Sequence, residues 1–228
     1  MEQIFLDNVP VQNSQQEYSF HPFYDEVVSP LPHVDLNFRV QGKVLPSDHS
    51  YALYAALSHF QDRIHSLEDI GIQPITGIQT KEGVLTLNDT SCLRIRVPAE
   101  LVPLLYPLAG KQLTIGKHEI WLGIPEIHLL KPATKLYSRI VTIRGFQEPE
   151  PFLEAVERQL QQRGIRGRVS LFTNTEGIPR RRTLQVKKYT IVGFGVEIED
   201  LCEEDSLLLQ TYGIGGKRKM GCGIFLKH

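Results

Sequence analysis

The chain repeats one order of strand and helix patterns: strand, helix, strands, helix, strand. Alternating apolar residues predict strands, and apolar residues spaced by three and four predict helices. In the strand at 92–97, for example, Leu93 and Ile95 lie opposite Arg94 and Arg96. The first half is expected to contain strands at 34–44, 73–80, 84–87, 92–97, 112–115 and 119–122, a helix at 47–60, capped by Ser47 or Asp48, and a short, Pro-interrupted helical stretch at 99–108.

The second half repeats this order with little sequence identity to the first. It is expected to contain strands at 137–145, 168–172, 182–189, 193–198 and 222–226, and helices at 151–163 and 200–212. Each half matches the split β-α-β unit called ferredoxin-like. The predicted fold is therefore α+β, with two tandem ferredoxin-like (RRM-like) halves that have antiparallel sheets. The expected domains are an irregular N-terminal arm at 1–33, a first half at 34–130 and a second half at 135–228, with a linker at 131–134.

Composition excludes several classes of protein. A net charge of −1 over 228 residues gives no global bias toward nucleic acid, so any such site must come from local clustering. Cys92, Cys202 and Cys222 show no CxxC spacing, so neither a disulfide framework nor a zinc site is expected. No apolar run reaches membrane-spanning length, and the first ten residues lack the apolar core of a signal peptide. We expect a soluble cytoplasmic protein without a metal, a cofactor or a membrane partner.

A glycine-rich stretch near the C-terminus, Gly213-Ile-Gly-Gly-Lys-Arg-Lys-Met-Gly-Cys-Gly223, has five glycines in eleven residues. Glycines with interspersed cations suggest a phosphate-bearing partner, held by backbone N–H groups and positive charge. The stretch fails the P-loop pattern, because Thr211 and Arg218 stand where glycine and Ser or Thr are required. An RNA backbone is therefore favoured over ATP or NAD. The predicted RNA contacts here are Gly213, Gly215, Gly216, Lys217, Arg218 and Lys219.

A second basic segment lies on the predicted hairpin of the second half. It contains Arg180, Arg181, Arg182, Lys187 and Lys188 without an intervening acid, whereas acids gather at 197–205. A solvated charged face is the alternative interpretation. The segregation of charge favours a nucleic-acid surface, which Arg139 and Arg144 on the first strand of the same half could extend.

His49 is the candidate for acid–base chemistry. It lies at the start of the first helix, in Leu45-Pro-Ser-Asp-His-Ser-Tyr51, where the helix dipole disfavours the imidazolium form. The alternative is a surface or capping histidine. Tyr54 is interpreted as a packing residue. The spacing of His59, Asp62, His65 and Glu68 is interpreted as a polar helix face rather than a metal site.

Paired ferredoxin-like halves, the glycine-rich stretch before the last strand and a histidine at the first helix resemble the CRISPR-repeat-processing endoribonucleases of the repeat-associated (RAMP) superfamily. The resemblance covers residues 34–226, and the glycine-rich stretch is its most specific part.

The resemblance implies binding of CRISPR repeat RNA at a stem-loop and cleavage of the precursor transcript into guide RNAs without metal. The 2′-OH attacks the adjacent phosphate and leaves a 2′,3′-cyclic phosphate and a 5′-OH. His49 would act as general base or general acid, and Tyr51 would orient the phosphate or the nucleophile. The product could stay bound within a CRISPR effector or a transposon-associated complex. The alternative function is a non-catalytic RNA-binding subunit of a CRISPR ribonucleoprotein.

Overall fold

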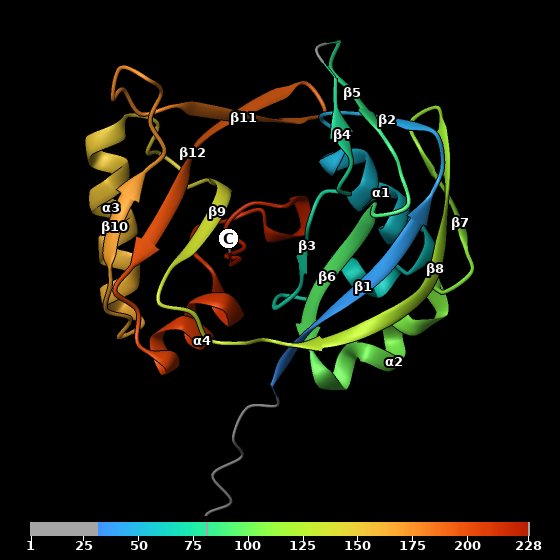
Figure 1. The fold of residues 1–228 in the computed structure, drawn as a ribbon, viewed down its shortest axis with the longest axis horizontal. Helices are drawn as coiled ribbons and strands as arrows, with labels where there is room; N and C mark the ends of the chain where they lie inside the picture. The colour runs from blue at the N-terminus through green and yellow to red at the C-terminus, as the bar shows by residue number, and fades with distance from the viewer. Residues whose placement is uncertain (1–31, 81, 228) are drawn as a thin grey trace, which may run out of the picture. The chain divides into compact units, whose positions relative to one another are not determined.

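The computed structural model describes residues 32–80 and 82–227, so the N-terminal arm expected at 1–33 lies almost wholly outside the described residues (Figure 1). Residues 31–228 form one compact unit. The elements of its first half are β1 (His33–Gln41), β2 (Val44–Pro46), α1 (Ser50–Phe60), β3 (Gly71–Ile72), β4 (Ile78–Gln79), β5 (Val84–Thr86), β6 (Cys92–Pro98), α2 (Val102–Leu105), β7 (Gln112–Ile115) and β8 (His118–Leu129). Those of its second half are β9 (Leu136–Val141), α3 (Pro149–Gln162), β10 (Arg168–Leu171), β11 (Arg181–Val186), β12 (Tyr189–Glu199) and α4 (Glu203–Tyr212).

The sheet of the first half has the order β3-β6-β1-β8-β7, with antiparallel pairing throughout. β1, β3, β6 and β8 take the places of the four strands of a ferredoxin-like unit, and β7 extends the sheet at the β8 edge. A small three-stranded sheet, β2-β5-β4, lies beside it.

The sheet of the second half is arranged around the long strand β12. β11 pairs with its first part and β10 with its last part, while β9 pairs with its opposite edge. β9, β10 and β12 take the places of the first three strands of a ferredoxin-like unit, and β11 is an added hairpin strand. The predicted tandem fold is confirmed. The strand expected at 222–226 is wrong, because only a single bridge between Tyr137 and Leu226 forms there.

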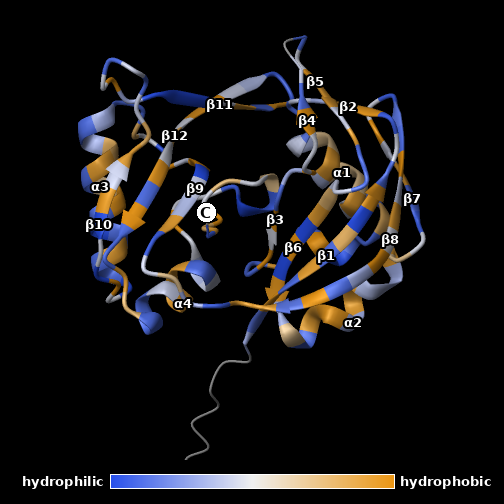
Figure 2. Cartoon of the chain, in the orientation of Figure 1, coloured by the Kyte–Doolittle hydropathy of each residue, from blue (hydrophilic) through white to orange (hydrophobic). Residues whose placement is uncertain are grey.

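Each half has its own hydrophobic core. In the first, Phe38 and Ile95 of the sheet are buried with Leu53 and Leu57 of α1. In the second, a cluster that includes Phe152, Phe194 and Phe225 is fully buried. Figure 2 shows the alternation of apolar and polar residues along the strands of the first sheet, which is the period-two signal of a sheet with one buried face.

Of two local expectations in the first half, one is confirmed and one is wrong. The short, Pro-interrupted helical stretch expected at 99–108 consists of a 3₁₀ turn, the one-turn helix α2 and a second 3₁₀ turn. Pro103 and Pro107 explain the interruption, since each removes a backbone N–H that a continuous helix would need. α1 is not capped by Ser47 or Asp48: its N-cap is His49, without a side-chain capping hydrogen bond.

Arg96 joins the two halves. Its Nε and Nη2 donate to Asp35 Oδ1 and Oδ2 at 2.8 and 2.9 Å. Its Nη1 donates to the backbone oxygens of Gln210 and Phe225, at 2.9 and 2.8 Å, on α4 and after the glycine-rich stretch. The side chain is only 1% exposed. One buried guanidinium thus fixes the second half against the first sheet. No helix among the described residues is both long enough and apolar enough to cross a membrane.

Candidate nucleic-acid interface

The glycine-rich stretch, here called the glycine loop (Gly213–Gly223), is packed against β9 and against itself. Gly213 is the C-cap of α4 and takes a φ of +62°. A Cβ on Gly213 would lie 2.0 Å from the oxygen of Gly223, and one on Gly223 would lie 2.0 Å from the oxygen of Ile214. Glycine is required here because two backbone segments touch.

Most N–H groups of the glycine loop bond to protein oxygens. Gly215 N–H donates to Gln159 Oε1 at 2.9 Å, and Gly216 N–H donates to the oxygen of Thr142 at 2.9 Å. The N–H groups of Gly213, Ile214, Met220, Gly221, Cys222 and Gly223 donate to backbone oxygens. The expectation that these groups hold a phosphate is therefore wrong for this conformation.

The three cations of the glycine loop have different surroundings. Lys217 is exposed, in the left-handed region with φ of +63°. Arg218 donates to the oxygen of Thr211, and burial, helped by the nearby Arg96 charge, lowers its pKa to about 10. Lys219 Nζ donates to the oxygen of His65 at 2.6 Å. Arg218 and Lys219 thus hold the loop in place, and Lys217 is the one that faces solvent.

Two adjacent glycines provide a matched test of this packing. We expect Gly215→Ala to lower the free energy of unfolding by about 1–3 kcal/mol, because φ is +75° and the new Cβ would lie 2.4 Å from the oxygen of Thr142. Gly216→Ala should change it by less than about 0.5 kcal/mol, because nothing lies within 4 Å of that Cβ. Urea denaturation of both variants measures the difference, and equal losses would contradict the packing role.

The second basic segment divides into paired and unpaired cations. Arg181 on β11 pairs with Glu148. Arg139, Arg180 and Arg182 form no ion pair within the described part of the chain, and Arg182 Nε is buried without a hydrogen-bond partner. Burial and the charges of Arg139 and Arg180 lower the pKa of Arg182. These three arginines, whose charges are unpaired among the described residues and act on one another, are here called the arginine cluster.

The remaining two cations of this segment lie in the turn between β11 and β12. Lys187 takes a left-handed conformation with φ of +53°, and Lys188 Nζ lies 5.5 Å from the ring centre of the exposed Tyr189. The whole segment thus lies on one hairpin, as predicted.

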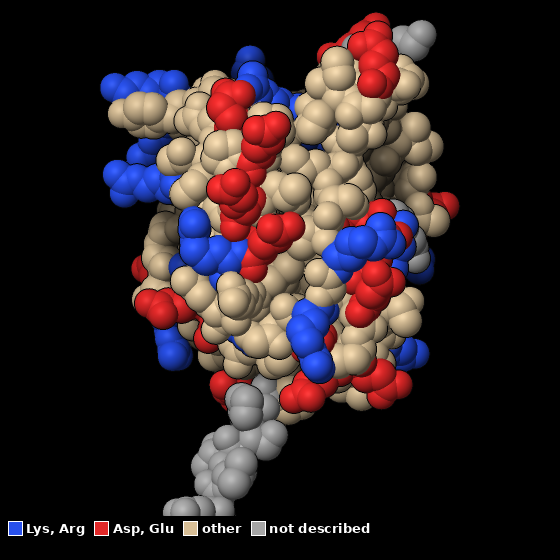
Figure 3. Space-filling model, turned by 90° about the vertical axis from the view of Figure 1, so that its left-hand side faces the viewer, with Lys and Arg blue, Asp and Glu red and all other residues tan. Residues whose placement is uncertain are grey.

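Exposed acidic side chains gather on the α3 side of the molecule. A run of acidic side chains crosses this face (Figure 3). The exposed carboxylates at and just before α3 are Glu148, Glu150, Glu154 and Glu157. A phosphate backbone would be repelled by these carboxylates.

His49 is buried at 2% exposure, and both of its ring nitrogens are hydrogen-bonded. Nε2 accepts from the Ile75 N–H at 2.9 Å, so Nδ1 carries the proton and donates to the oxygen of Pro46 at 2.8 Å. Burial lowers the pKa of His49, and the nearby Arg139 charge lowers it further. The imidazole is therefore neutral and lies close to the arginine cluster.

Asp48, the residue before His49, joins the start of α1 to the second half. Asp48 Oδ2 accepts from the Gln185 N–H of β11 at 3.0 Å. Tyr51 lies in the first turn of α1 and is half-buried. The start of α1 is thus fixed against the basic hairpin.

A tyrosine–histidine pair was not predicted from the sequence. Tyr54 OH and His65 Nδ1 are 2.7 Å apart, and Tyr54 borders a cavity on the α1 side of the glycine loop with Lys217 and Lys219. The chain reverses between Tyr54 and His65, so helical spacing could not show that they meet. The sequence showed only that a tyrosine and a histidine are present in this region.

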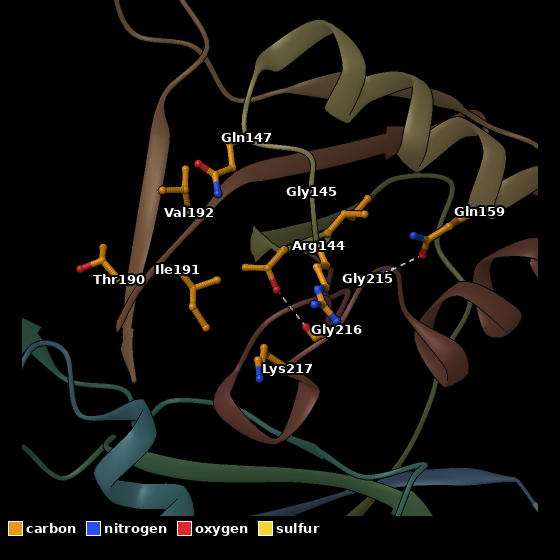
Figure 4. Close-up of a pocket in the computed structure, with 12 residues that line it drawn as sticks. Arg144, Gly145, Gln147, Gln159, Thr190, Ile191, Val192, Gly215, Gly216 and Lys217 are labelled. Atoms are coloured by element: carbon orange, nitrogen blue, oxygen red, sulfur yellow. Dashed lines mark hydrogen bonds between the residues drawn. The ribbon is translucent and has the colours of Figure 1, made fainter. Parts of the chain in front are cut away.

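A cavity of about 460 Å³ lies on the other side of the glycine loop (Figure 4). The loop contributes Gly215, Gly216 and Lys217 to its lining, and Arg144 also lines it. Thus three predicted loop residues and one predicted strand arginine meet here. Among the described residues, no group of three or more His, Cys, Asp or Glu side chains is arranged to hold a metal ion.

Comparisons with known proteins agree on one family. The family model described as "Cas6 Crispr" matches residues 34–228. A protein of Myxococcus xanthus (strain DK1622) named "CRISPR-associated endonuclease Cas6" is 36% identical over 193 residues, which cover 85% of this chain and 80% of that protein.

Solved structures share the fold. One described as "CRISPR associated protein Cas6" superposes with a TM-score of 0.62 at 14% identity, covering 86% of this chain and 99% of that chain. Another, described as "An RAMP protein binding different RNA substrates", gives 0.58 at 15% identity and covers 85% and 98%. A third, a Cas6-related protein from Pyrococcus furiosus, gives 0.57 at 16% identity and covers 86% and 97%.

Proposed function

Because this chain belongs to the Cas6 family of CRISPR-associated proteins, we propose that it is an endoribonuclease that cuts the repeats of a CRISPR precursor transcript. The observation that best supports this function is the arginine cluster close to His49. The cluster supplies positive charge for a phosphate, and His49 is a neutral base close to it. In-line cleavage requires both, held in one geometry.

In the proposed reaction, His49 Nε2 takes the proton of a ribose 2′-OH, whose oxygen attacks the adjacent phosphorus. The bond to the 5′ oxygen of the next nucleotide breaks, giving a 2′,3′-cyclic phosphate and, once that oxygen takes up a proton, a 5′-OH. The lowered pKa of His49 favours the role of base over that of acid, because the ring is already unprotonated. Nε2 must first exchange the Ile75 N–H for the substrate hydroxyl. Tyr51 is proposed to orient the phosphate or the nucleophile.

The Tyr54–His65 pair is the second candidate for proton transfer. Its histidine is exposed and borders the same loop, so it needs no such exchange. We favour His49, because it lies near arginine charges that have no partner among the described residues. The cation beside His65 is Lys219, and its Nζ already bonds to the backbone oxygen of His65.

We further propose that the RNA backbone follows the arginine cluster, the turn between β11 and β12 and the exposed part of the glycine loop. The contacts are Arg139, Arg180, Arg182, Lys187, Lys188, Gly215, Gly216 and Lys217. Gly213, Arg218 and Lys219 act by holding the loop, since Gly213 is buried and both cations bond to protein oxygens.

The test is cleavage of repeat RNA by the wild-type protein in EDTA, followed by analysis of the product ends. We expect undiminished cleavage, a 3′ product end that resists phosphatase until acid opens the cyclic phosphate, and a 5′-OH that a kinase can label. Cleavage lost in EDTA, or a 3′-OH end, would overturn the mechanism. Binding without cleavage would support the non-catalytic alternative.

Arg182→Gln and Arg181→Gln provide a matched pair for the binding surface. We expect Arg182→Gln to weaken repeat binding about 10-fold and to lower the salt dependence by about one phosphate contact. Arg181→Gln should weaken binding by about 3-fold or less, because Glu148 already pairs with Arg181. Removing Arg182 also removes repulsion, so the melting temperature should stay level or rise. A lower melting temperature with unchanged binding would mean that Arg182 is only structural.

A further inference from the structure

The cavity of about 460 Å³ beside the glycine loop has a lining suited to one nucleotide (Figure 4). Ile143, Ile191 and Val192 give it apolar walls. Arg144 and Lys217 give it two positive charges, and no acidic residue lines it. Its volume is that of a small-molecule site, too small for a paired helix. Apolar walls suit the faces of a base, and the two cations suit its phosphate.

Gln159 of α3 supplies a fixed hydrogen-bond donor in this cavity. Its Oε1 accepts from the Gly215 N–H at 2.9 Å, so the amide oxygen must point to the glycine loop. Nε2 is then turned away from the loop, to the side where Arg144 lies (Figure 4). A side-chain amide fixed in this way distinguishes a base edge that offers an acceptor from one that does not.

The glycines of the lining keep the site open. Gly145 and Gly216 have nothing within 4 Å of the place where a Cβ would lie. Gly215 lets the loop approach Thr142, whose Oγ1 donates to the oxygen of Gly216 at 3.2 Å. Glycine backbone therefore borders the cavity, with open space beside Gly145 and Gly216.

We propose that this cavity binds a single unpaired nucleotide of the RNA, with Gln159 Nε2 donating to an acceptor on the base edge and Arg144 and Lys217 holding its phosphate. This inference rests on the proposed function. It adds a base-reading site to an interface otherwise made of backbone contacts, and unpaired bases are the usual targets of sequence-selective RNA recognition.

The test uses Gln159→Glu, which keeps an oxygen for the Gly215 N–H and replaces the donor by an acceptor. Gln162→Glu, an exposed position on the same helix, is the control for added charge. A set of repeat RNAs carries one abasic residue at each unpaired position in turn. Dissociation constants are measured for the wild type and both variants, and cleavage of the unmodified repeat is followed in the same preparations.

We expect one abasic position to weaken binding by the wild type and by Gln162→Glu about 10-fold. Gln159→Glu should bind the repeat that is abasic at that position as tightly as it binds the unmodified repeat, because this variant has already lost the contact to the base. If no abasic position weakens wild-type binding, or if the loss is equal in Gln159→Glu, the nucleotide site is overturned. Cleavage of the unmodified repeat alongside such a result would leave the proposed function standing.

Discussion

Replacing Arg96 by methionine is expected to lower the free energy of unfolding by about 3–5 kcal/mol. The change leaves the buried Asp35 carboxylate without its bidentate partner and the oxygens of Gln210 and Phe225 without a donor. Methionine has a volume similar to that of arginine, so the substitution leaves little empty space. The loss of unfolding free energy therefore reports the polar groups that are left unpaired. Urea denaturation, followed by circular dichroism, measures it.

Arg94→Ala is the matched control on the same strand. Arg94 Nε lies 3.9 Å from Asp35 Oδ2, and its side chain is 37% exposed. We expect it to cost about 0–1 kcal/mol. The double variant Arg96→Met with Asp35→Leu should recover part of the loss, because it removes the uncompensated buried charge. Equal costs for Arg94→Ala and Arg96→Met would show that Arg96 does not join the two halves.

The order of elements could be predicted because each signal is local. Alternation marks strands such as β1 and β6, and helical spacing marks α1 and α3, without knowledge of their neighbours. The prediction failed where tertiary contacts decide. Residues 222–226 have the composition of a strand, yet the glycine loop positions them so that only Leu226 pairs with Tyr137.

The roles of individual cations could not be predicted, for the same reason. Arg94 and Arg96 occupy equivalent places in the alternation, but only Arg96 meets carbonyl oxygens more than one hundred residues away in the chain. In the glycine loop, Lys217 faces solvent while its neighbour Arg218 turns inward to Thr211. Neighbouring cations look equivalent in the sequence, but their different burial in the folded protein gives them different roles.

The candidate site was found in outline. The sequence pointed to the basic hairpin and the glycine loop. In the structure the charge of Arg139 helps to lower the pKa of His49, and Lys217 and Arg144 line the same cavity. The sequence could not show that His49 is buried, since its hydrogen bond to Ile75 spans 26 residues. Gln159 was not predicted either, because a glutamine in a helix does not indicate a binding role until the loop that it contacts is known.

His49→Ala is expected to slow single-turnover cleavage of repeat RNA by about 10²–10⁴-fold, the range for loss of a general base. The pH dependence identifies the role. A general base requires the neutral ring. The rate should therefore rise with pH through the pKa of His49 in the folded protein, which lies below 6.5, and then stay level. An acid would give the opposite slope.

Stability must be measured beside the rate, because His49 also supports the fold. Its lowered pKa means that the neutral ring stabilises the folded state above pH 6.5, and this contribution is lost as pH falls through the folded pKa. His49→Ala leaves the oxygen of Pro46 and the N–H of Ile75 without their partner. His49→Gln keeps an amide at the site, and both variants should bind repeat RNA within a few-fold of the wild type while failing to cut it.

His65→Ala separates the two candidate histidines. It removes the exposed partner of Tyr54 and leaves the surroundings of His49 unchanged, so cleavage should stay within about 3-fold of the wild type. If His65→Ala abolishes cleavage while folded His49→Gln still cuts, proton transfer belongs to the Tyr54–His65 pair. In that case the hydrogen bonds of His49 serve to hold the start of α1 against the loop that contains Ile75, and the arginine cluster binds a phosphate that is cut from the other side of the glycine loop.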